Sequence, residues 1–273
     1  MTAVPVVPDW ASRLRVTQLR VMLSEWTKLR SLRSTRWSML VSVLLTVGLP
    51  LLAAAVTSAR WSHMSPIDRA ERNPLDIALL GVRVAQLAIG VLGVLVISGE
   101  YSTGMIRATI GAVPKRLPVL WAKVAVFAAA SFVLAVPSVL AAFFGSQAIL
   151  DRHGILQISF SSSGVARSVI GGALYLTVVG VLALSLGAMT RNTAGGIALF
   201  AAIFFVIPPL MNILPSSWND AISEYLPSSA GADVFSLTHG PHDLSPGPGF
   251  ALFCGYTALT IVVAAALLLR RDA

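Results

Sequence analysis

The histidines are the first side chains to consider for chemistry, because imidazole is a common metal ligand and a general acid or base near neutral pH. His239 and His242 stand close to Asp243, a grouping that could hold a metal ion. The segment around them is rich in proline and glycine, and such spacing is frequent by chance. His63 and His153 stand alone in other polar segments. The sequence therefore predicts no metal site.

The sequence also gives no support for nucleophilic catalysis or for nucleotide binding. Ser98 and Ser185 lie in apolar stretches with no histidine at a similar depth, and the sequence has no Gly-x-Ser-x-Gly nucleophile turn. It also lacks the phosphate-binding pattern Gly-x-x-x-x-Gly-Lys-[Ser/Thr]. We expect that this chain is not an enzyme and that it does not bind or hydrolyse ATP by itself.

Arg83 and Gln86 are polar residues inside a long apolar stretch, and two interpretations stay open. The arginine could snorkel to the nearby external surface, about two helical turns away. Alternatively, both side chains could line a substrate path. The apolar stretches contain no Asp or Glu, so a carrier driven by protons or sodium ions is not favoured.

The elements that hold these residues follow from the composition. Of 273 residues, 56% are hydrophobic and only 12% are charged, whereas soluble proteins carry about 25% charged residues. A helix needs about 20 apolar residues to cross a membrane. The stretches that satisfy this are 37–58, 77–98, 119–145, 168–189, 193–213 and 249–269. The fold class is an all-α integral membrane protein with six spans, of which the third and fifth should kink or break at Pro137 and at Pro208–Pro209.

The chain has a net charge of +8, and its charged residues are divided unequally between the two sides of the membrane. Most Lys and Arg residues fall on the side of both termini, and most acidic residues fall on the other side. The positive-inside rule then predicts a multi-pass protein of the plasma (inner) membrane with both termini in the cytoplasm. We expect the basic residues to meet membrane lipid rather than nucleic acid.

The chain divides into a cytoplasmic N-terminal part, residues 1–36, and a six-span domain, residues 37–273. Residues 12–36 predict an amphipathic helix in the headgroup layer. Its apolar face comprises Leu19, Met22, Leu23, Trp26, Leu29 and Leu32, and its polar face comprises Arg15, Arg20, Lys28, Arg30 and Arg33. This helix is either a membrane anchor and topology signal alone or a docking surface for a cytoplasmic partner.

The cytoplasmic segment 99–118 predicts a short helix between the second and third spans. Ser102 or Thr103 can cap it, and Gly111 and Pro114 should end it. Glu100 would then be a charge at the start of this helix, where the helix dipole favours a carboxylate.

Two segments resemble a known family. Residues 24–37, and residues 99–107 followed by Pro114, Lys115, Arg116 and Lys123, are similar to the permease subunits of ATP-binding-cassette type-2 exporters of the actinobacterial type. The resemblance implies that this chain forms the substrate path with a second copy of itself or a paralogue. It also implies that a separate ATPase subunit binds ATP and Mg, so that this chain holds no cofactor.

The resemblance assigns roles to particular residues. The helix at about 102–111 would be the coupling helix, and Glu100 would pair with a basic group of the ATPase. The coupling residues are Glu100, Tyr101, Ser102, Thr103, Gly104, Met105 and Arg107, and the interface helix, about 14–33, contributes Glu25, Trp26, Lys28 and Arg30.

The same resemblance suggests a path and a gate. The second and fifth spans would line the path, with Arg83 and Gln86 as candidate residues. Residues 215–237 would form short re-entrant helices that gate the exit, with Trp218 and Tyr225 as aromatic anchors. The alternatives are a membrane assembly or sensor protein that transports nothing and, less favoured, an intramembrane enzyme.

Overall fold

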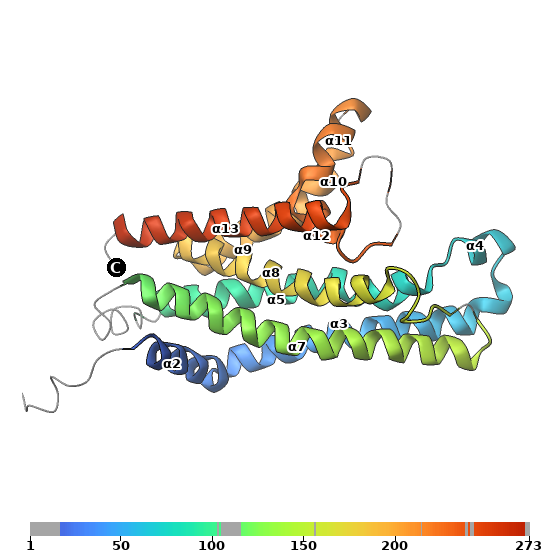
Figure 1. Cartoon of the computed structure of the whole chain (residues 1–273), viewed down its shortest axis with the longest axis horizontal. Coiled ribbons are helices and arrows are strands. Elements are labelled where there is room, and N and C mark those ends of the chain that lie inside the picture. The colour runs from blue at the N-terminus through green and yellow to red at the C-terminus, as the bar shows by residue number, and fades with distance from the viewer. Residues whose placement is uncertain are drawn as a thin grey trace, which may run out of the picture.

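A computed structural model describes residues 17–102, 104, 116–155, 157–213, 215–237, 240 and 243–270. Within these residues the chain is built from helices, and no strand is present. Figure 1 shows the long helices lying side by side as a bundle. One end of the bundle, here named the α2 end, carries α2 (Gln18–Ser31). The opposite end, named the α4 end, carries α4 (Pro66–Ala70).

Among the described residues, six helices are long and apolar enough to cross a membrane, which indicates a membrane-embedded protein. They are α3 (Arg33–Arg60), α5 (Pro74–Ser102), α7 (Arg116–Arg152), α8 (Val165–Thr190), the segment beginning with α9 (Thr193–Ala201), and α13 (Pro246–Arg270). Each coincides with one predicted span. Five extend past the predicted bounds, because helical hydrogen bonding continues into the polar flanks of an apolar stretch.

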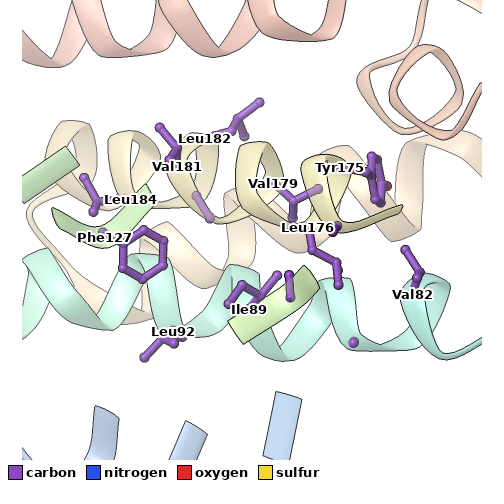
Figure 2. Close-up of a cluster of buried hydrophobic side chains, with 14 of the residues drawn as sticks. Val82, Ile89, Leu92, Phe127, Tyr175, Leu176, Val179, Val181, Leu182 and Leu184 are labelled. Carbon is purple, nitrogen blue, oxygen red and sulfur yellow. The ribbon is translucent and has the colours of Figure 1, made fainter. Parts of the chain in front are cut away.

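The centre of the bundle is α8, which packs against α5, α7 and α13. Figure 2 shows side chains of α8, among them Leu176 and Val179, facing Val82 and Ile89 of α5. The two backbones approach closely, since a Cβ atom at Gly93 would lie 2.3 Å from the carbonyl oxygen of Gly180. Only glycine at position 93 permits this contact, which is how small residues let membrane helices pack tightly.

The prolines that were expected to kink or break the third and fifth spans behave differently in the two. The expected break in the fifth span is confirmed: α9 passes into a π-helical turn (Ala202–Val206) and then α10 (Ile207–Met211), whose start holds Pro208. Pro208 has no N–H to donate to the preceding turn, and the wider turn absorbs this. In contrast, α7 continues as one helix through Pro137, so a break there is not observed.

The N-terminal helix is shorter than predicted. It ends at Ser31, and Leu32 adopts an extended conformation (φ −73°, ψ 123°) before α3 begins at Arg33. The prediction of one helix over 12–36 is therefore wrong at its C-terminal end, since residues 33–36 belong to the first span. Residues 12–16 lie outside the described residues.

Short helices lie outside the six long ones. A 3₁₀ turn (Trp61–His63) and α4 follow α3, while α11 (Ser216–Ile222), a 3₁₀ turn (Ser223–Tyr225) and α12 (Pro227–Ala232) precede α13. Short helices were expected within 215–237, and they are present. Figure 1 shows α10 and α11 leading away from the long helices. The predicted coupling helix falls mostly on residues 105–115, outside the described residues.

Candidate functional site: a buried ring of four charges

Four charged side chains from three helices meet at the α2 end. The ammonium group of Lys28 lies 2.7 Å from Oε1 of Glu25 and 2.9 Å from Oε1 of Glu100. The ammonium group of Lys123 lies 2.5 Å from Oε2 of Glu25 and 2.9 Å from Oε1 of Glu100. The two lysines and two glutamates alternate in a closed arrangement without net charge, here named the charge ring.

Helix periodicity explains how α2 supplies half of this ring. Glu25 and Lys28 are three residues apart, so they lie on the same face of α2. Val21 and Leu29 share that buried face with Glu25. Val21 packs against Val119 and Ala122 near the start of α7, within the turn that precedes Lys123. This apolar contact sets the position of α2 across the bundle.

Three members of the ring are buried so deeply that their pairing is essential, while Lys28 is partly exposed. Glu25 and Lys123 are each 3% exposed, and Glu100 is 5% exposed. An unpaired charge in such a place costs several kcal/mol. Burial alone would lower the pKa of Lys28, but hydrogen bonds to Glu25 and Glu100 and the charges of both carboxylates raise this pKa above its ordinary value.

One carboxylate oxygen of the ring is left over. Oε2 of Glu100 is buried and has no hydrogen-bond partner among the described residues. Glu100 and Lys28 line a pocket between the α2–α3 junction and the last turns of α5, with Leu32, Thr35 and Val96 among its other walls. The site therefore offers a negative acceptor next to a cavity, in a chain whose α2 end is otherwise basic.

The position of Glu100 corrects one interpretation. It was expected at the start of a short helix, where the helix dipole favours a carboxylate, but it lies in the last turn of α5. At a helix C-terminus the dipole disfavours a carboxylate, and Lys28 and Lys123 compensate for this. Ser102 is the last residue of α5, and its hydroxyl donates to the carbonyl oxygen of Gly99.

The remaining coupling candidates are partly described. The guanidinium of Arg191, in the turn between α8 and α9, lies 5.3 Å from the ring centroid of Tyr101. Gly104 has a left-handed φ of 71°. Thr103, Met105 and Arg107 lie outside the described residues.

The predicted faces of α2 need a correction as well. Lys28 was placed on the polar face of a helix in the headgroup layer, but it points into the charge ring. Leu29 was placed on the membrane-facing apolar side, yet it is buried in the bundle. Trp26 remains exposed, and Arg30 is exposed too. The helix thus has a third face, which packs against the protein, beside the lipid-facing and basic faces that the sequence predicted.

Arg83 and Gln86 lie near a group of aromatic side chains on the α4 side. The guanidinium of Arg83 lies 5.7 Å from the ring centroid of Phe235. The hydroxyl of Tyr175 donates to Oε1 of Gln86, and Tyr175 packs on Phe235 and Phe253. Arg83 itself is exposed. Both interpretations of Arg83, snorkelling and lining a path, remain predictions.

The two aromatic gate candidates are exposed. Trp218 on α11 is 62% exposed, and Tyr225 is 49% exposed. The backbone carbonyl of Tyr225 accepts a hydrogen bond from the hydroxyl of Tyr256 on α13, at 2.9 Å. The short helices are therefore attached to the last span, while re-entry into a membrane remains a prediction.

Sequence reasoning named three members of the ring but not their meeting. Lys123 entered only through the family resemblance, and no role was predicted for it. One signal was available, because Glu25 and Glu100 are rare acids in segments dominated by basic residues. Among the described residues, no group of His, Cys, Asp or Glu that could hold a metal ion is found.

Comparison with known proteins adds no assignment. No protein-family model matches the chain, and no curated protein matches it significantly. The class defined by fold and site is thus a helical, membrane-embedded protein with an internally neutralised cluster of charges at one end.

Proposed function

We propose that this chain is the permease subunit of an ATP-driven exporter. It forms a substrate path together with a second copy or a paralogue, and a separate ATPase subunit binds ATP and Mg. The observation that carries the proposal is the charge ring, which ties α2 to the end of α5 and the start of α7. The segment between α5 and α7 is the predicted coupling helix.

The charge ring could transmit a movement of the ATPase to the membrane-spanning helices. An ATPase that displaces the segment between α5 and α7 acts directly on Glu100 and Lys123, which flank it. Both groups hold α2 through Glu25 and Lys28. Because separating buried charges is costly, these three helix ends move together. The spans then alternate between two packings as rigid bodies.

The free oxygen of Glu100 supports contact with the ATPase. Oε2 is the one carboxylate oxygen of the ring without a hydrogen bond among the described residues. A basic side chain of the partner would complete its coordination. On this proposal both termini lie in the cytoplasm and the protein resides in the plasma membrane, as the distribution of basic residues suggests.

The path is proposed along α5, whose exposed side bears Arg83 together with Leu80, Val84 and Leu87. A second permease subunit would cover this side. Trp218 and Tyr225 would then border the exit at the α4 end.

The test is purification of the tagged full chain from its native membrane in mild detergent. We expect an ATP-binding protein to co-purify in equal amount and to hydrolyse ATP faster with the chain than without it. The variant Glu100→Gln should keep the complex but abolish this stimulation. The matched control, Glu71→Gln, removes an exposed acid at the α4 end and should change neither.

Two results would overturn the proposal. A chain that purifies alone, from cells that express an ATPase encoded beside it, would favour a membrane assembly or sensor protein. Unchanged ATP hydrolysis by the Glu100→Gln complex would remove the coupling role of the ring, even if the complex exists.

A further inference from the structure

The first turn of α3 presents two arginines above an apolar stripe. Arg33, Arg36, Trp37 and Leu40 line a shallow surface groove, and their spacing of three, four and seven residues places them on one side of the helix. Trp37 is 66% exposed, and Leu40 is 45% exposed. Leu44, four residues further on, is 59% exposed and continues the stripe.

The charges in this groove are not compensated by the chain. The structure gives no ion pair for Arg33 or Arg36 within the described part of the protein, and the first turn of α3 contains no acidic residue. Glu25 and Glu100, the glutamates of the charge ring, are already held by Lys28 and Lys123. Two cations in the first turn are also disfavoured by the helix dipole. An external anion would pair with both arginines and would offset their unfavourable interaction with the helix dipole.

The order of the side chains identifies the kind of anion. From Arg33 to Leu44 a helix rises about 16 Å, close to the thickness of one leaflet's hydrocarbon layer. Along that rise the exposed side changes from guanidinium to indole and then to aliphatic side chains. Phosphate, glycerol and acyl chain follow each other in the same order in a phospholipid. Free phosphate would use only the upper part of the groove.

We propose that this groove is a binding site for an anionic phospholipid. The guanidinium groups of Arg33 and Arg36 hold the headgroup phosphate, Trp37 lies at the level of the glycerol, and Leu40 and Leu44 contact an acyl chain. This inference needs only that α3 spans a membrane, and it does not depend on a transport function.

The test is native mass spectrometry of the full chain in detergent, titrated with phosphatidylglycerol or with phosphatidylcholine. We expect saturable binding of one phosphatidylglycerol, with phosphatidylcholine bound much more weakly. The variant Arg33→Gln/Arg36→Gln should lose about thirtyfold in affinity, at about 1 kcal/mol for each basic residue near an anionic surface and 1.4 kcal/mol for each factor of ten.

Matched variants separate a site from general attraction. Arg20→Gln/Arg30→Gln removes two exposed basic residues of α2 and should change the affinity by less than about threefold. The variant Arg33→Lys/Arg36→Lys keeps the charge and should fall between wild type and the glutamine variant. Each variant is first checked for a single size-exclusion peak and unchanged helical circular dichroism.

Three outcomes would overturn the proposal. Equal binding of phosphatidylcholine would show that charge is not recognised. An equal loss in the Arg20→Gln/Arg30→Gln variant would show diffuse attraction rather than a groove. The third outcome has two parts: excess inorganic phosphate displaces the lipid, and the remaining lipid binding no longer depends on Arg33 and Arg36. That outcome would assign the groove to free phosphate.

Discussion

Lys123 is the most deeply buried cation that the structure describes in the charge ring, and its loss tests the ring at the scale of one residue. In the variant Lys123→Met, Glu25 and Glu100 would share the single cation Lys28. Breaking a buried ion pair on one side costs about 3–5 kcal/mol. We expect a loss of that order in unfolding free energy in detergent. The control Arg30→Met, on the exposed side of α2, should change stability by less than about 1 kcal/mol.

A double-mutant cycle distinguishes the ring from simple packing. Adding Glu100→Gln to Lys123→Met removes one uncompensated carboxylate, so the double variant should be more stable than the sum of the two single losses predicts. If the two losses in unfolding free energy simply added, Lys123 and Glu100 would have no electrostatic interaction and would contribute to stability only through packing.

The raised pKa of Lys28 predicts a dependence on alkaline pH. A cation whose pKa is higher in the folded state than its ordinary value of 10.5 stabilises the fold fully below that ordinary value. This contribution is lost as the pH rises through the folded pKa. When thermal unfolding of the wild type is measured at increasing pH, the unfolding temperature should therefore fall in a step above pH 10.5, the ordinary pKa of lysine. The step should be absent in Lys28→Gln, and a step of the same size in that variant would assign it to other groups.

At the scale of elements, the contact between α5 and α8 depends on glycine. A methyl group at position 93 would lie 2.3 Å from the carbonyl oxygen of Gly180, so Gly93→Ala must push the two helices apart. We expect a loss of about 1–3 kcal/mol, as for overpacked cores. The matched control is Gly99→Ala, six residues further along α5, where a methyl group meets no atom within 4 Å.

That control should be neutral or stabilising by up to about 1 kcal/mol, since alanine favours helix more than glycine does. Chemical unfolding in mixed detergent micelles measures both variants. Equal stability of the two variants would mean that α5 and α8 do not need their close approach.

The spans could be predicted from the sequence because each is a local property. A run of apolar residues long enough to cross a membrane needs no knowledge of its neighbours, and all six runs became helices. Leu32 shows the opposite case. Leucine is a good helix former, and nothing in its neighbourhood signals an end, yet the helix stops there. The helix that ends there packs on α7 through contacts about a hundred residues apart, such as Gln18 with Pro118, which the local sequence does not reveal.

The charge ring was beyond sequence reasoning for the same reason. Glu25, Glu100 and Lys123 come from three separate helices, and only the assembled bundle brings them together. The sequence indicated that two acids stand among basic residues, but it could not show that each would find two lysines of its own chain.

At the scale of the whole molecule, the orientation of the bundle can be tested by labelling with a membrane-impermeant thiol reagent. The natural Cys254 is the single cysteine and is first replaced in the variant Cys254→Ser. Exposed positions at each end, Ser24 in α2 and Ser62 before α4, are then changed one at a time to cysteine.

In intact cells we expect Ser62→Cys to react and Ser24→Cys to react only after the membrane is opened, because the basic end should face the cytoplasm. The reverse pattern would place both termini outside. It would also place the charge ring beyond the reach of a cytoplasmic ATPase.

The junction at Leu32 has a mechanical consequence. One extended residue reaches no more than about 3.6 Å, so α2 and α3 are joined by a hinge without slack. The charge ring holds α2 against the ends of α5 and α7, so a displacement of the ring would be passed on to the first turn of α3. α2 would then connect the charge ring to the first membrane-spanning helix, whose first turn holds Arg33 and Arg36.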